Sequence, residues 1–153
     1  MSVTIRQARQ SDLATILALY AQPEIDDGAV LPVAEAEEIF RRFSAYPDYR
    51  LFVAEHQGEI VGSYALLIMD NLGHQGARSA VIEDVVVDPA FQGAGIGKAM
   101  MRHALAEARI KGCYKAALSS NLKRERAHAF YDSLGFERHG YSFLARLELE
   151  ETV

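Results

Sequence analysis

Ile82-Glu83-Asp84-Val85-Val86-Val87-Asp88-Pro89-Ala90-Phe91-Gln92-Gly93-Ala94-Gly95-Ile96-Gly97-Lys98 is the stretch that decides the fold. Its first part is apolar and β-branched, which predicts a strand. Asp88-Pro89 ends that strand, because proline has no amide donor and restricts the residue before it. A glycine-rich turn then leads into residues 98–109, which favour a helix. Such a turn leaves amide groups without partners at the start of the helix, and this arrangement predicts a phosphate-binding site.

Three kinds of phosphate-binding loop compete for this stretch. A Walker A loop is excluded because Gly97-Lys98 is followed by Ala99, which has no hydroxyl group for magnesium. A dinucleotide-binding fingerprint is excluded because the glycines alternate with single residues and the next predicted strand ends in serines. The pattern that remains is Gln-x-x-Gly-x-Gly, formed by Gln92, Gly95 and Gly97.

This pattern resembles the pyrophosphate loop of the GNAT superfamily of acyl-CoA-dependent N-acetyltransferases, (Arg or Gln)-x-x-Gly-x-(Gly or Ala). The valine strand and Asp-Pro before the loop, the helix after it, and Phe-Tyr-x-x-x-Gly-Phe at residues 130–136 also match the superfamily. The resemblance spans nearly the whole chain, most closely residues 80–144. It implies one N-acetyltransferase domain over residues 1–153.

Hydrophobic periodicity and turn residues predict the order of elements. The prediction is a strand at 3–8, a helix at 12–22 capped by Ser11-Asp12, a helix at 33–45, strands at 50–55 and 60–68, the central strand and helix, a strand at 114–118, a helix at 123–134 and a final hairpin at 136–148. Antiparallel strands followed by a βαβα order argue for an α+β fold with three layers. In that fold a mixed, mostly antiparallel twisted sheet carries helices on both faces, as in the GNAT superfamily.

Composition narrows the class of protein. The chain has 153 residues and 16.9 kDa, of which 50% are hydrophobic and 24% charged, as in an ordinary globular domain. Its net charge of −5 argues against nucleic acid or an acidic membrane as partner. The single Cys113 fits a reducing compartment, and no apolar leader or long apolar run is present. We therefore expect a cytoplasmic protein without a membrane segment.

The resemblance assigns the co-substrate, acetyl-CoA, to the central stretch. The peptide-like pantetheine arm is expected to bind alongside Val85, Val86 and Val87, whose amides would also polarise the thioester carbonyl. The pyrophosphate is expected on the backbone amides of the loop, with charge added by Lys98 or with that lysine merely solvated. The loop residues in this assignment are Gln92, Gly93, Ala94, Gly95, Ile96 and Gly97.

The resemblance suggests two further cofactor contacts, but the spacing of the residues differs from that of the superfamily. Superfamily members often carry a cofactor-binding asparagine seven residues before the tyrosine, whereas Asn121 lies ten residues before Tyr131 and Arg124 occupies the seventh position. Asn121 therefore either contacts CoA or serves as a turn residue. Arg124, with Lys123 and Arg126, either binds the ribose 3′-phosphate or forms a solvated helix start.

The resemblance also names catalytic candidates. Tyr131 matches the position of the superfamily's general acid, which protonates the departing thiolate. Glu83 and, second to it, Asp84 are candidates for the base that deprotonates the amine. Because adjacent strand residues point to opposite faces, at most one of the two is expected to reach the thioester. A structural ion pair, a carboxylate at a strand bulge and deprotonation through water are the alternatives.

We expect direct transfer of an acetyl group from acetyl-CoA to the primary amine of a small molecule. Residues 112–115 with 82–84, and residues 118–131, are similar to glucosamine-phosphate and aminoalkylphosphonate N-acetyltransferases. A peptide N-acetyltransferase and a non-catalytic acyl-CoA-binding sensor or subunit are the alternatives. Specificity is expected in the loops 23–32 and 70–78 and in the final hairpin; Glu24, Asp26 and Asp27 could attract an ammonium group. No metal site is expected, and the resemblance allows a homodimer.

Overall fold

A computed structural model describes residues 2–147 of the chain. The chain divides into two compact units, residues 1–118 and 119–153, and each is described by itself. The prediction of a single domain over residues 1–153 therefore stays a prediction. No helix in the described range is long and apolar enough to cross a membrane.

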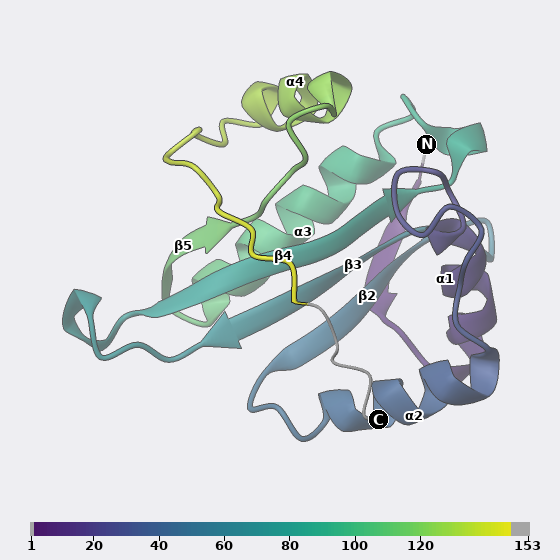
Figure 1. The fold of residues 1–153 in the computed structure, drawn as a ribbon, viewed down its shortest axis with the longest axis horizontal. Coiled ribbons are helices and arrows are strands. Elements are labelled where there is room, and N and C mark those ends of the chain that lie inside the picture. The colour runs from purple at the N-terminus through teal and green to yellow at the C-terminus, as the bar shows by residue number, and fades with distance from the viewer. Residues whose placement is uncertain (1, 148–153) are drawn as a thin grey trace. The chain divides into compact units, whose positions relative to one another are not determined.

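The first unit is built on a five-stranded sheet with the order β1-β2-β3-β4-β5. The strands are β1 (Thr4–Gln7), β2 (Tyr49–His56), β3 (Glu59–Met69), β4 (Arg78–Val87) and β5 (Cys113–Ala117). Neighbours pair in antiparallel fashion from β1 to β4, whereas β5 pairs with β4 in parallel. Figure 1 shows β2, β3 and β4 side by side, with α3 (Ile96–Ile110) forming the connection between β4 and β5. The predicted mixed, mostly antiparallel sheet is confirmed.

Helices α1 (Leu13–Tyr20) and α2 (Val33–Phe43) cover one face of this sheet. Their apolar positions recur at helical spacing, so each presents one stripe to the strands. The buried cluster that results contains Ala8, Leu13, Ile16, Leu17, Ala36, Leu51, Val53 and Ala65. This cluster fixes the end of α1 and the start of the segment 21–32 against the sheet.

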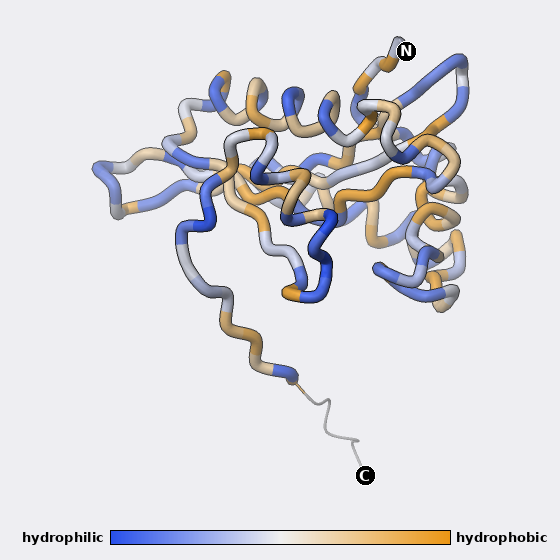
Figure 2. The backbone as a smooth tube through the Cα atoms, turned by 90° about the horizontal axis from the view of Figure 1, so that it is seen from above, coloured by the Kyte–Doolittle hydropathy of each residue, from blue (hydrophilic) through white to orange (hydrophobic). Residues whose placement is uncertain are grey.

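Helix α3 covers the opposite face and buries Ile96, Met100, Met101, Ala104 and Ala108. Its turns, along the top of Figure 2, alternate between orange and blue, as expected for an amphipathic helix. Close approach to β3 requires glycine at position 62, because a Cβ there would lie 3.1 Å from Ile96 Cγ2, Met100 Sδ and Val86 O. The first turn of α3 is therefore pressed against β3 beside the end of β4.

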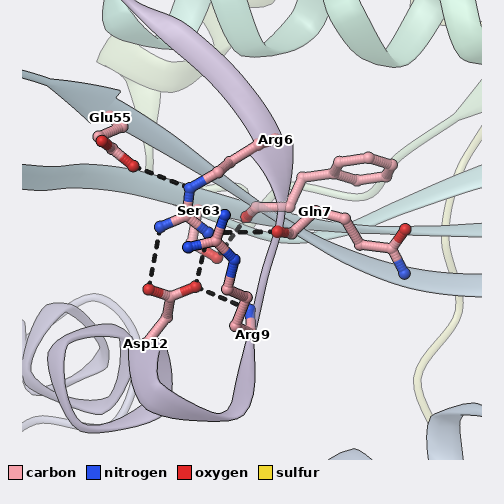
Figure 3. A network of polar contacts seen from close by, with 7 residues as sticks. Arg6, Gln7, Arg9, Asp12, Glu55 and Ser63 are labelled. Carbon is pink, nitrogen blue, oxygen red and sulfur yellow. Dashed lines mark hydrogen bonds and ion pairs between the residues drawn. The ribbon is translucent and has the colours of Figure 1, made fainter. Parts of the chain in front are cut away.

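An ion-pair network joins β1, β2 and the entry to α1 (Figure 3). The Arg6 guanidinium donates to both Asp12 carboxylate oxygens at 2.7 and 3.0 Å and to Glu55 Oε2 at 2.8 Å. Asp12 also accepts the Arg9 amide at 2.7 Å and belongs to a short 3-10 helix, Gln10–Asp12, that precedes α1. Asp12 is the N-cap residue of α1, within the predicted Ser11-Asp12 pair, but its carboxylate makes no capping hydrogen bond to this helix and closes the preceding turn instead.

The second unit contains α4 (Glu125–Ser133), in place of the predicted helix at 123–134. The predicted final hairpin is wrong for residues 136–147, which contain no strand, and Glu148 lies outside the described residues. Its alternating apolar side chains remain exposed, Tyr141 by 90% and Phe143 by 93%. Alternation indicates a strand only where a partner strand is in register, and the pattern alone does not supply that partner.

Candidate functional site

The site begins where β4 loses one of its neighbours. Strand β5 pairs with β4 from Arg78 to Val81, where Val81 lies opposite Ala117. Strand β4 continues to Val87 with β3 as partner, and no strand in residues 2–147 pairs with its other edge beyond Val81. Residues 82–87 are called the free half of β4 below. An open strand edge binds an extended, peptide-like molecule through its backbone groups.

Backbone directions in the free half follow from the pairing with β3. The Asp88 amide donates to Val61 O at 2.8 Å, so residue 88 directs its backbone toward β3. Because backbone groups alternate between the two edges of a strand, Val85 and Val87 direct theirs toward the open edge. The Val87 carbonyl accepts Gln22 Nε2 at 2.9 Å, in agreement with this direction. The open amides thus belong to two of the three valines expected to bind pantetheine.

A β-bulge lies at the start of the free half. Asp84 has a φ of 52°, and the register with β3 shifts between Ser63 and Ala65. Glu83 lies opposite Ala65 and Val86 opposite Ser63, so Glu83 and Val86 share a face although simple alternation separates them. Of the alternatives open for the two acidic residues, the structure therefore supports a carboxylate at a strand bulge.

The carboxylates at the bulge repel one another. Burial and then the charge of Asp84 raise the pKa of Glu83, whereas burial and then the charge of Asp26 raise the pKa of Asp84. The surroundings therefore favour the protonated forms and make both groups stronger bases than free carboxylates. This suits a proton acceptor.

Two tyrosines complete the same region and were not predicted as site residues. Burial and then the charge of Asp84 raise the pKa of Tyr20 above its ordinary range. Burial, Asp84 and Glu83 raise the pKa of Tyr49, whose ring stacks on Phe43 at 4.1 Å. The sequence shows Tyr20 only as one apolar position of α1, and nothing in the local pattern brings Tyr49 to the bulge.

The loop after β4 presents free amides. Asp88 caps the short 3-10 helix Pro89–Phe91 by accepting the Ala90 amide at 2.9 Å, and the Ala94 amide donates to Phe91 O at 3.2 Å. Gly95 precedes α3 with a φ of 88°, and no side chain caps that helix. Within the described part of this loop, amides without a hydrogen-bond partner are those of Gly93, Gly95, Ile96, Gly97 and Lys98. These amides and the helix dipole can hold a diphosphate.

The remaining candidates lie in the second unit. Asn121 acts as a turn residue, because its Oδ1 accepts the Lys123 amide at 2.9 Å and its carbonyl accepts the Arg124 amide at 3.0 Å. Arg124 occupies the position before α4, and a contact of either residue with CoA stays a prediction. Tyr131 packs its ring against Phe130 and Phe136 at 5.2 and 5.6 Å, and burial raises the pKa of its phenol.

Residues 2–147 contain no group of three or more His, Cys, Asp or Glu side chains placed to hold a metal ion. Cys113 is a free thiol at the start of β5, and burial raises the pKa of that thiol. A raised pKa keeps the thiol protonated and poorly nucleophilic.

Known proteins are similar to this chain over most of its length. Residues 11–136 match the model of the acetyltransferase (GNAT) family. A glucosamine 6-phosphate N-acetyltransferase of Trypanosoma brucei brucei is 34% identical over 140 residues, 91% of this chain and 92% of its own length. An aminoalkylphosphonate N-acetyltransferase of Salmonella typhimurium is 33% identical over 101 residues, 66% of this chain and 65% of its own.

Solved structures show the same fold. A putative acetyltransferase from Agrobacterium tumefaciens superposes with a TM-score of 0.86 and 34% identity, covering 94% of this chain and 99% of its own. The chain therefore belongs to the GNAT family of acetyltransferases, which are enzymes of the acyltransferase class.

Proposed function

We propose that the protein transfers the acetyl group of acetyl-CoA directly to the primary amine of a small molecule. One observation carries the proposal: the open edge of β4 leads straight into a loop with free amides at the start of α3. A chain of this family needs both features, one for an extended arm and the other for a diphosphate.

The cofactor-binding residues follow from this arrangement. Val85 and Val87 offer backbone groups on the open edge to the pantetheine arm, and Val86 holds the strand to β3. The free amides of Gly93, Gly95, Ile96, Gly97 and Lys98 bind the diphosphate, and Gln92 and Ala94 shape the turn that presents them. Acetyl-CoA supplies the acetyl group as an activated thioester.

The acidic residues at the bulge remove the proton from the acceptor ammonium. Glu83 is the first candidate and Asp84 the second, either directly or through water, since both have raised pKa values. The free amine then attacks the thioester carbonyl, whose developing charge is stabilised by the Val85 amide. The carbon–sulfur bond breaks, Tyr131 gives its phenolic proton to the thiolate, and the surplus proton on the new amide nitrogen restores the phenol.

A small acceptor is supported by the relatives. The two curated proteins described above are named for glucosamine 6-phosphate and for aminoalkylphosphonates, both of which carry a primary amine. We extend this class of acceptor, without a particular compound, to the present chain.

Release of free thiol from acetyl-CoA tests the proposal. The acceptors to compare are glucosamine 6-phosphate, 2-aminoethylphosphonate, spermidine and a short peptide with a free N-terminus. We expect thiol release with at least one of the three small amines. Release with the peptide alone would favour a peptide N-acetyltransferase, whereas CoA binding without release would favour an acyl-CoA-binding protein.

A further inference from the structure

The segment between α1 and α2 is folded tightly on itself. The Asp26 amide donates to Tyr20 O at 2.9 Å, the Asp27 amide to Gln22 O at 3.1 Å and the Gly28 amide to Ala21 O at 2.9 Å. These bonds tie the turn to the last residues of α1. Movement of Gln22 is therefore transmitted to residues 26–28.

This segment follows the free half of β4. At one end of that half, Gln22 Nε2 donates to the Val87 carbonyl at 2.9 Å. At the other end, the Asp26 carboxylate lies close enough to Asp84 to raise the pKa of Asp84. The hydrogen bond fixes residue 22 at the last residue of the strand, and the charge interaction indicates that Asp26 lies on the side of the bulge.

We propose that Gln22 is a positioning residue that couples acceptor binding to the cofactor strand by holding the segment 21–32 on the Val87 carbonyl. The inference rests on the proposed function, because it takes residues 84–87 as the place where cofactor arm and amine meet. A carbonyl oxygen has two lone pairs, so the Val87 carbonyl accepts Gln22 and an amide of the pantetheine arm together. Binding of the arm then orders the segment that carries Asp26.

Glutamine suits this role for a physical reason. The Val87 carbonyl points away from β3 toward the open edge, where it otherwise faces solvent or ligand. A neutral amide donor satisfies one lone pair and adds no charge beside the acidic residues at the bulge. Methionine has a similar length and no donor, so Gln22→Met removes the hydrogen bond while it keeps most of the volume.

Hydrogen exchange of the backbone amides tests the coupling with CoA as the probe. In the wild-type chain we expect CoA to slow exchange both in residues 93–98 and in residues 26–28. In Gln22→Met we expect the protection of 93–98 to remain and that of 26–28 to be lost. Gln10→Met, at an exposed glutamine of the same unit, is the matched control and should behave as wild type.

Kinetics with the amine selected by the thiol-release panel give a second readout. One lost hydrogen bond predicts an acceptor KM raised by about fivefold, with kcat and the CoA dissociation constant within about twofold. A lower kcat, a higher KM for both substrates and a lower melting temperature, all together, would mean that Gln22 only supports the fold. Gln22→Ala repeats the test should the methionine variant fold poorly.

The possible failures are distinguishable. Unaltered CoA-induced protection of residues 26–28 in Gln22→Met would overturn the inference and leave the proposed function standing. If CoA protects no residue of the wild-type chain, the proposed function fails. Hydrogen exchange without ligand then still tests whether Gln22 holds the segment 21–32 on the Val87 carbonyl. The amides of residues 26–28 should exchange faster than in wild type in Gln22→Met and at the wild-type rate in Gln10→Met.

Discussion

Asp84 holds a backbone conformation that few side chains adopt. Its φ of 52° lies in the left-handed region, which asparagine and aspartate tolerate better than other non-glycine residues. Burial and then the charge of Asp26 add an electrostatic cost to the ionised carboxylate of the same residue. Strain of both kinds at one residue of a strand is typical of a functional site, where stability is given up for chemistry.

Replacement of Asp84 with asparagine is expected to stabilise the protein at alkaline pH. The pKa of Asp84 is raised in the folded state, so folding favours the protonated form and ionisation destabilises the fold as pH rises through that pKa. The asparagine side chain stays neutral and tolerates the same φ. The melting temperature of Asp84→Asn should exceed that of wild type at pH 8 and approach it below about pH 4. A lower melting temperature at pH 8 would contradict this electrostatic account.

Tyr131 gives a second prediction at the same scale. Burial raises the pKa of its phenol, so the proton stays in place at neutral pH and is available for transfer. If Tyr131 is the general acid, Tyr131→Phe lowers kcat by about 100-fold or more, the usual range for a lost acid. Affinity for CoA, measured by calorimetry, should stay within about twofold. An unchanged kcat would show that Tyr131 is not the general acid and that its ring only packs against Phe130 and Phe136.

At the scale of elements, the turn between β4 and α3 is the most specific feature. Every signal that predicted it is local: the valine run, Asp88-Pro89 and the glycines follow one another along the chain. Local signals are the ones that a sequence carries without knowledge of the partner strands. The loop, the strand and the start of α3 were therefore predictable together.

Gly95 tests this element directly. Its φ of 88° disfavours any side chain, and no atom lies within 4 Å of an added Cβ. Gly95→Ala therefore carries only the backbone cost, about 1–2 kcal/mol, and should still bind CoA. Gly95→Glu carries the same cost and adds a negative charge beside the diphosphate, so CoA binding by calorimetry should be lost. Tight binding by the glutamate variant would contradict the loop assignment.

The bulge and the tyrosines show why other parts of the site were not predictable. Strand geometry predicts that Glu83 and Asp84 point to opposite faces of the sheet. It does not predict the bulge, because the face on which Val86 lies depends on the register with β3. Tyr20 and Tyr49 come near the carboxylates only because α1 packs against β4 and because β2 lies one strand away from β4, across β3. Contacts between distant segments depend on tertiary packing, which residue patterns do not encode locally.

At the scale of the whole molecule, the first unit separates its two tasks by face and edge. Helix α3 on one face carries the free amides of the loop, while α1 and the segment 21–32 on the other approach the acidic residues. Strand β4 takes part on both sides, because its bulge lies near the acidic residues and its last residue, only a few positions further on, leads into the loop. The position of α1 on the sheet therefore matters for the acceptor side as much as for stability.

The Arg6–Asp12–Glu55 network sets that position and gives the last prediction. The Asp12 side chain is 9% exposed, and removal of its carboxylate takes from the partly buried Arg6 one of its two carboxylate partners and from the Arg9 amide its acceptor. Asp12→Ala should lower the free energy of unfolding by about 2–3 kcal/mol at pH 7. Glu38→Ala, which removes an exposed helix pair at 3.7 Å, should cost at most about 0.5 kcal/mol.

The pH dependence of this loss separates the ion pair from mere packing. The Arg6 guanidinium lowers the pKa of Asp12, so the carboxylate stabilises the fold above its unfolded pKa of about 3.9. That stability is lost as pH falls through the lower pKa of the folded state. Urea denaturation should therefore show the full difference between wild type and Asp12→Ala from about pH 5 to 8 and a smaller one below about pH 4. A difference independent of pH would instead assign the loss to packing at the start of α1, and α1 would then be held by its apolar face alone.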